Sequence, residues 1–290
     1  MTAVELKNLS KYYKKSCGIE DVSLTIQEGE IFGFIGPNGA GKSTTIRTLL
    51  NLLQPTGGSA TIFGKDIVSN SKEIKKMVGY LPSEVHYYDD MRAIDLLLYS
   101  AKFHHYKNTE RIHELAEKLQ LDLNKKIEDL SFGNRKKVGI IQAILHEPKL
   151  LILDEPTGGL DPLMQNTFFE LISKEREKGA TIFFSSHILS EVQKMCDRVA
   201  IIKDGKLVAV EKVETLIKNN LKKISLTMKN EEEVSLPFEG IADKQTREKN
   251  TTFLYSGDMK QLLNHLSSLD LTDVLIQEPS LDEVFMHYYE

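Results

Sequence analysis

The chain has only two cysteines, no tryptophan and no long apolar run. Cys17 and Cys196 are far apart and lie in no CxxC or Cys/His pattern, so neither a disulfide framework nor a structural zinc site is indicated. The longest apolar runs, such as residues 150–153, are far shorter than the roughly 20 residues that span a bilayer, and the first residues lack the apolar core of a signal peptide. We therefore expect a chain in a reducing compartment with no transmembrane segment of its own.

A strong charge of one sign is also absent. Lys and Arg number 37 and Asp and Glu number 42, which gives a net charge of -5. This balance argues against a surface built to neutralise phosphate backbones, so we expect no nucleic-acid partner. With 290 residues, of which 41% are hydrophobic and 27% charged, the composition is that of a globular protein about twice as long as a domain of roughly 150 residues. One large domain and one small domain are the first expectation.

Apolar residues follow two strand patterns. Residues 4–6, 22–26 and 60–63 alternate between apolar and polar, which is typical of half-buried antiparallel strands. The runs at 31–35 and at 149–153, and a third at 180–184, are apolar on both faces, as buried parallel strands are. Because helical stretches separate these three runs, the pattern predicts an α/β fold with a parallel sheet and crossover helices.

Helical and mixed patterns fill the rest of the chain. Residues 88–145 have apolar residues with a period of 3.6, which predicts a helical insert. Residues 211–223 are rich in Lys and Glu and indicate a helix and connector. From 221 onward we expect a small α+β domain with three strands, a helix over 258–269, a strand over 271–277 and a helix over 280–289.

A glycine-rich loop follows the first buried strand and precedes a helical stretch over 44–53. It fits the pattern GxxxxGK[ST]. Its glycines let backbone N–H groups face phosphates, Lys42 can reach the β- and γ-phosphate oxygens, and the hydroxyl of Ser43 suits Mg²⁺. The predicted ATP-binding residues of this loop are Gly36, Pro37, Asn38, Gly39, Ala40, Gly41, Lys42, Ser43 and Thr44.

Two carboxylates at the end of the second buried strand complete this site. Asp154 is predicted to hold Mg²⁺ through water, and Glu155 to orient and polarise the attacking water as a general base. A GTPase would need an NKxD motif for the guanine base. The nearest match, at residues 124–127, reads NKKI and lacks the Asp, so guanine specificity is unsupported.

Together these motifs resemble, in order over residues 2–210, the ATP-binding subunit of a bacterial ATP-binding cassette (ABC) transporter. The resemblance implies a cassette over 1–210 with a RecA-like mixed sheet core, an antiparallel β subdomain and a helical signature subdomain, followed by a connector over 211–220 and the small domain over 221–290. It implies that Tyr13 stacks on adenine and that His187 is a catalytic residue at the γ-phosphate. It also implies a signature motif and a D-loop that contact the ATP of a second cassette, through Ser131, Gly133, Asn134 and Asp161.

The physical properties of a helix N-terminus also indicate a role for the signature. Ser131 is predicted to cap the helix that follows it, and a helix N-terminus carries free N–H groups and a partial positive charge, which suit a γ-phosphate. The resemblance places this end against the ATP of the opposite subunit, in a homo- or heterodimer of cassettes.

Several positions depart from the family pattern. The signature reads LSFGN rather than LSGGQ, because Phe132 and Asn134 replace Gly and Gln, and Gly158 stands where the D-loop Ser is usual. Ser83 occupies the place of the family's Q-loop glutamine, which makes Ser83 a candidate Mg²⁺ contact. Either Ser83 or Glu84 could take over that role.

These variants, together with the C-terminal stretch EPSLDEVF, are similar to the ABC-2-type exporters of drugs, antibiotics and peptides. The resemblance implies a peripheral ATPase at the cytoplasmic face of the membrane that drives a separate permease, with ATP and Mg²⁺ as cofactors and a drug, antibiotic or amphipathic peptide as substrate. The alternative is a soluble ABC ATPase that acts in regulation, in resistance, or on ribosomes or DNA. It is the weaker alternative, because only one cassette is present and no long heptad insert separates its motifs.

Overall fold

The structure is a computed structural model that describes residues 1–14, 16–218, 222–230, 235–237, 239–277 and 279. The chain folds into two compact units, Met1–Glu211 and Lys212–Glu290. Each unit has a hydrophobic core of its own.

A six-stranded sheet with the order β10-β9-β3-β8-β7-β6 forms the centre of the first unit. The paired strands from β9 to β6 run parallel, as the apolar runs in the sequence predict. Every residue of β3, β7 and β8 is buried, so these three strands occupy the middle of the fold. The strands are β3 (Ile31–Ile35), β6 (Val78–Leu81), β7 (Leu150–Asp154), β8 (Thr181–Ser186), β9 (Arg198–Lys203) and β10 (Lys206–Lys212).

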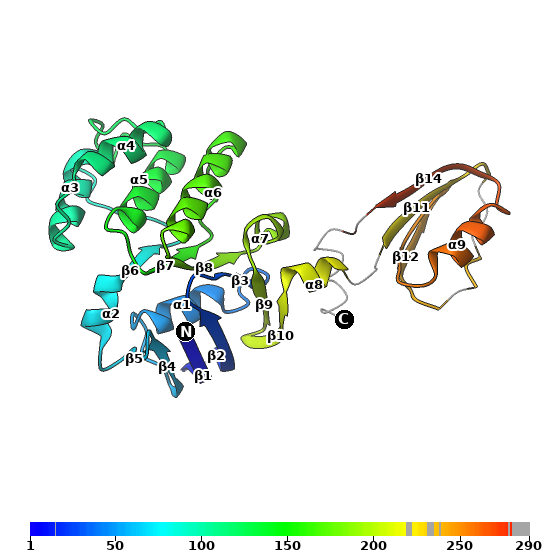
Figure 1. The fold of residues 1–290 in the computed structure, drawn as a ribbon, viewed down its shortest axis with the longest axis horizontal. Helices are drawn as coiled ribbons and strands as arrows, with labels where there is room; N and C mark the ends of the chain where they lie inside the picture. Colours follow the sequence, from blue (N-terminus) through cyan, green and yellow to red (C-terminus); the bar gives the residue numbers. More distant parts are fainter. Residues whose placement is uncertain (15, 219–221, 231–234, 238, 278, 280–290) are drawn as a thin grey trace. The chain divides into compact units, whose positions relative to one another are not determined.

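A four-stranded sheet with the order β2-β1-β4-β5 packs with helix α1 on one side of the central sheet (Figure 1). Its strands pair antiparallel, which confirms the alternating patterns near residues 4, 22 and 60. Apolar side chains of both sheets and of α1 form one continuous core. The elements are β1 (Thr2–Tyr13), β2 (Ser16–Gln27), β4 (Gly57–Ile62), β5 (Lys65–Asp66), α1 (Lys42–Leu49) and α2 (Ser71–Met77).

Helices α3 to α6, in green in Figure 1, cover the other side of the central sheet. The predicted helical insert consists of three helices joined by loops, and α5 packs against α3, α4 and β6. The elements are α3 (Ala93–Phe103), α4 (Glu110–Lys118), α5 (Phe132–Ile144), α6 (Pro162–Glu177) and α7 (Leu189–Met195).

Helix α1 ends earlier than the expected residue 53. Asn51 adopts a left-handed conformation with φ 52°, and the amides of Leu52 and Leu53 turn back to the carbonyl of Arg47. This closure ends the helix because the chain can no longer continue the i to i−4 pattern. The apolar residues 52 and 53 therefore belong to the following turn.

The second unit is a sheet of order β12-β13-β11-β14 with helix α9 against its core. The stretch at 211–223, expected as a helix and connector, contains one helix, between β10, which extends to Lys212, and β11, which begins at Lys222. Helix α9 is also shorter than expected; Asp258 caps it by accepting from the amide of Lys260. The predicted helix over 280–289 lies outside the described residues. The elements are α8 (Val213–Lys218), β11 (Lys222–Met228), β12 (Ile241–Arg247), β13 (Asn250–Tyr255), α9 (Met259–Leu266) and β14 (Leu271–Gln277).

Candidate functional site

The glycine-rich loop joins the end of β3 to the start of α1. Gly39 and Gly41 have φ angles of 82° and 110°, a region that side chains disfavour. A Cβ on Gly36 would lie 2.3 Å from the carbonyl oxygen of Ile202, so the loop also needs glycine for close packing against β9. Gly41 is the N-cap of α1 and provides no side-chain cap, which leaves the first amides of the helix available to an anion.

The catalytic candidates meet beside this loop. Lys42 is 5% exposed, and its Nζ donates to the carbonyls of Gly36 at 2.7 Å and Pro37 at 3.2 Å. Glu155 Oε1 lies 3.4 Å from Lys42 Nζ and 3.3 Å from His187 Nδ1. The carboxylate of Glu155 therefore lies within charge-pairing distance of both the amine and the imidazole.

Asp154 differs from Glu155 in being fully buried. Its Oδ1 accepts from the hydroxyl of Ser185 at 2.6 Å, whereas its Oδ2 is buried and has no hydrogen-bond partner among the described residues. A buried carboxylate oxygen without a partner is costly, so it calls for a donor or a cation. Hard oxygen ligands of this kind fit a hydrated Mg²⁺ ion, which binds through one or two carboxylates and several waters.

A cavity of about 260 Å³ lies over the loop. It brings together three separate parts of the sequence: the phosphate loop with the start of α1, Ser83 after β6, and Glu155 after β7. Its lining is Asn38, Gly39, Gly41, Lys42, Ser43, Thr44, Ser83 and Glu155. Tyr13 lies near the cavity, because its ring and the side chain of Thr44, a lining residue, both pack against Gly18. A Cβ added to Gly18 would lie 2.8 Å from the Tyr13 ring and 2.9 Å from Thr44 Cγ2.

The signature residues stand apart from this cavity, because Ser131, Gly133 and Asn134 are not in its lining. Ser131 is the N-cap of α5, as predicted, and its hydroxyl accepts from the amide of Asn134 at 3.3 Å. Phe132 is 48% exposed, and its ring packs on Gly159, where an added Cβ would lie 2.3 Å from the ring.

Asp161, predicted as a D-loop contact, has a role within this chain. It caps α6 by accepting from the amides of Leu163 and Met164, both at 3.0 Å. Its carboxylate thus fixes the loop that follows Glu155 to the start of α6.

Two charged residues near the site escape the sequence motifs. Glu191 is buried, and its carboxylate accepts from the hydroxyls of Thr157 and of Ser186, the latter at 2.7 Å. It therefore joins the loop after Glu155 to the strand end before His187. The distance from Thr157 to Glu191 along the chain explains why no local pattern indicates this link.

The second is Lys136, which is 0% exposed although it is charged. Its Nζ donates to the carbonyls of Pro82 at 3.0 Å and Ser83 at 2.9 Å. Burial lowers the pKa of Lys136 to about 8, while the carboxylates of Asp154 and Glu155 act to raise it. The lysine is thus protonated at neutral pH. Its place on the same helical face as the buried Ile140, four residues on, is the signal that could have indicated it.

Comparison with known proteins places the chain in a family. The sequence profile described as "ABC transporter" matches residues 19–158. The bacitracin transport ATP-binding protein BcrA of Bacillus licheniformis is 35% identical over 98% of this chain and 96% of its own length. The linearmycin resistance ATP-binding protein LnrL of Bacillus subtilis (strain 168) is 34% identical over 71% of this chain and 68% of its own length.

Solved structures agree with the sequence comparison. An ATP-binding subunit of an ABC transporter is 25% identical and superposes with a TM-score of 0.74, with 100% of both chains covered. The dimeric bacterial ABC transporter cassette MJ0796 is 26% identical with a TM-score of 0.67, covering 72% of this chain and 98% of that one.

The fold and the phosphate loop with its carboxylates define a P-loop ATPase of the cassette type. The chain belongs to the family of ABC transporter ATP-binding proteins, and it is an ATPase of the cassette type. In the described residues, no helix has both the length and the apolar character that crossing a membrane requires.

Proposed function

We propose that this chain works as one half of a cassette dimer at the cytoplasmic face of a bacterial membrane, where Mg²⁺-ATP hydrolysis drives export through a separate permease. The observation that carries this proposal is the cavity in which the phosphate loop, Ser83 and Glu155 meet. The bacitracin and linearmycin relatives support an antibiotic or an amphipathic peptide as the exported substrate.

Residues in the cavity lining and residues near it have chemical roles in this proposal. Lys42 and the amides of the loop bind the β- and γ-phosphates, and Tyr13 stacks on the adenine. Ser43 and Asp154 hold Mg²⁺, which neutralises phosphate charge when bound. Glu155 accepts the proton of the attacking water, and His187 donates to the γ-phosphate.

The ion pair between Lys42 and Glu155 sets the carboxylate in competition with a bound γ-phosphate. Because Glu155 Oε1 lies 3.4 Å from Lys42 Nζ, an incoming γ-phosphate competes with this carboxylate for the amine. ATP binding thus releases Glu155 from Lys42 and leaves the carboxylate free to take a proton. The contact between the Lys42 amine and the γ-phosphate supplies part of the binding free energy of ATP.

The separation of the signature from the cavity supports the dimer. Ser131, Gly133 and Asn134 lie at the N-terminus of α5 and outside the cavity of their own chain. In a head-to-tail pair, this helix end of one copy faces the γ-phosphate held by the other. The dimeric cassette among the similar structures supports the same arrangement.

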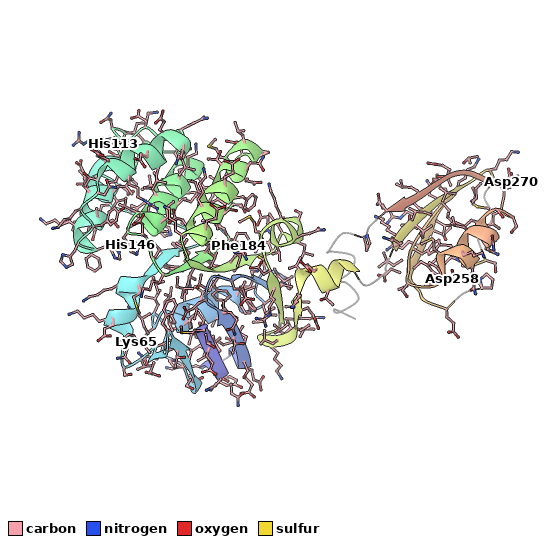
Figure 2. The ribbon with its side chains drawn as sticks, viewed as in Figure 1. Lys65, His113, His146, Phe184, Asp258 and Asp270 are labelled. Carbon is pink, nitrogen blue, oxygen red and sulfur yellow. The ribbon has the colours of Figure 1, made fainter. Side chains whose placement is uncertain are left out.

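A groove of about 400 Å³ supports docking of the permease. It lies between α3, α5 and the residues after β6, and His104 and His146 stack in it with ring centroids 3.7 Å apart. His146 lies where the helices meet the sheet (Figure 2). Exposed Tyr99 and Phe103 on α3 add apolar surface beside it, which favours a protein partner.

The test is co-purification of the tagged chain, expressed with its own permease, from detergent-solubilised membranes. We expect the permease to be recovered with the chain and to raise ATP turnover. Lys42→Ala should reduce turnover to background, because it removes the charged contact to the phosphates. Failure to recover a permease, together with ATP turnover that the membrane fraction does not raise, would instead favour a soluble regulatory ATPase.

A further inference from the structure

Lys136 is a charged side chain in the interior of the first unit. It belongs to α5, and none of its surface is exposed. Burying an ammonium group costs free energy unless hydrogen bonds and charges compensate, and lysine is almost never fully buried without such partners. An apolar residue would pack at this position without that cost, so the cation needs a reason.

Its partners are two successive backbone carbonyls. Nζ donates to Pro82 O at 3.0 Å and to Ser83 O at 2.9 Å. These residues follow directly after β6, whose neighbour in the sheet is β7, the strand that ends at Asp154. Ser83 lines the nucleotide cavity. Lys136 therefore joins the helix that begins at the signature to the loop that borders the cavity.

The charge of Lys136 has a second consequence. The carboxylates of Asp154 and Glu155 interact with it electrostatically and favour its charged form. The ammonium group that binds the carbonyls of Pro82 and Ser83 therefore also feels the charge of the site. Carbonyls bound to a helix side chain move with that helix, so a shift of α5 is transmitted to residues 82 and 83.

We propose that Lys136 is a positioning residue of the ATPase, which holds the loop at Pro82 and Ser83 against the nucleotide cavity and couples it to α5. The inference rests on the proposed function, because it assumes that hydrolysis at this cavity drives the transporter. It adds a residue outside the phosphate loop, the strand-end carboxylates and the signature. Lys136 touches the loop and not the nucleotide, so its effect reaches the reaction through Ser83.

The experiment compares Lys136→Met, which keeps most of the length and removes both hydrogen bonds, with Lys136→Gln, whose amide can still donate to a carbonyl. ATP turnover, ATP affinity and hydrogen exchange of the peptide spanning residues 80–90 are measured on the complex with the permease. For Lys136→Met we expect turnover about 10- to 100-fold lower, ATP affinity within about 3-fold of the wild type and faster exchange of the loop. Lys136→Gln should recover part of the turnover and part of the protection.

The matched control is Lys137→Met, which removes the neighbouring lysine from the same helix. It should keep turnover and loop protection near the wild type. Wild-type turnover and loop exchange in Lys136→Met would overturn the inference, and so would equal losses in the Lys137 variant, because these would assign the effect to helix packing. If Lys136→Met does not fold, Lys136→Gln alone decides, and unchanged loop exchange there would overturn the inference. Absence of permease-stimulated turnover in the wild type would instead refute the proposed function.

Discussion

At the scale of single residues, the site is a set of charged and titratable groups in mutual contact around Glu155. Glu155 has a backbone φ of 47°, a conformation that a non-glycine residue adopts only where its surroundings fix it. Its amide donates to the carbonyl of Ser185 at 3.1 Å, which ties it to the end of β8. This tie directs its carboxylate toward Lys42 and His187.

Replacing Glu155 by Gln keeps the shape of the side chain and removes both the base and the negative charge next to Lys42. We expect turnover to fall by at least about 100-fold, in the range of typical acid–base contributions. ATP should bind as tightly as to the wild type or more tightly, because no carboxylate competes for the amine. Titration with a fluorescent ATP analogue and a phosphate-release assay measure the two effects.

The matched control for that experiment is Lys42→Ala, which should lose both affinity and turnover. Glu155→Gln with weaker ATP binding would contradict the competition between Glu155 and the γ-phosphate. Retained turnover in this variant would remove Glu155 from the role of general base.

The sequence predicts the residues whose chemistry is local, and it misses those whose partners are distant. Lys42 and Glu155 follow from a loop motif and a strand end. Glu191 binds Thr157 from 34 positions along the chain, and Lys136 binds Ser83 from 53 positions away. Only tertiary packing brings such pairs together, so no spacing rule reveals them.

At the scale of elements, the geometry of the loop after β6 bears on two alternatives that the sequence leaves open, Ser83 and Glu84. Ser83 lines the nucleotide cavity. The side chain of Glu84 is 78% exposed, and its Oε2 lies 3.7 Å from Nε2 of His86, which is 87% exposed. The geometry thus favours Ser83 as the residue that acts at the nucleotide.

We expect Ser83→Ala to lower permease-stimulated turnover by about 2- to 13-fold, which corresponds to one hydrogen bond of about 0.5–1.5 kcal/mol. Glu84→Gln is the matched control and should leave turnover unchanged, because surface ion pairs contribute little. A steady-state ATPase assay with and without the permease measures both. A loss confined to Glu84→Gln would reverse the assignment, and equal turnover in all three proteins would leave this loop without a role in catalysis.

Strands buried on both faces, such as β3 and β7, were predictable because continuous apolar runs have few other uses in a chain of this composition. The residues at which helices and strands end were not predictable from the sequence. Helix α1 stops at Leu49 because Asn51 adopts a positive φ, although the apolar pattern continues to Leu53. Strand β6 is only four residues long, too short for a pattern to indicate.

At the scale of the whole molecule, the sequence-predicted site residues fall into two groups. The phosphate loop, Ser83 and Glu155 line one cavity, whereas Ser131, Gly133 and Asn134 lie at the start of α5 and outside it. A single chain therefore presents both halves of a composite site without combining them. In the dimer that we propose, two chains arranged head to tail would complete two such sites, and each ATP would contact both chains.

The last prediction concerns this assembly. Each copy carries a net charge of -5, so long-range electrostatics oppose pairing, and we expect local contacts, including those to bound ATP, to supply the attraction. Hydrolysis removes those contacts, so Glu155→Gln with ATP and Mg²⁺ should accumulate as a dimer in size-exclusion chromatography with light scattering, whereas ADP should leave it monomeric.

Adding Lys42→Ala to the same chain should abolish the dimer, because ATP is then held weakly. Ser131→Ala should weaken it less, since one helix cap is lost while the helix amides remain. A protein that stays monomeric with ATP and Mg²⁺, both alone and with the permease, would refute the head-to-tail arrangement; a dimer of equal strength without nucleotide would show that the contacts lie elsewhere.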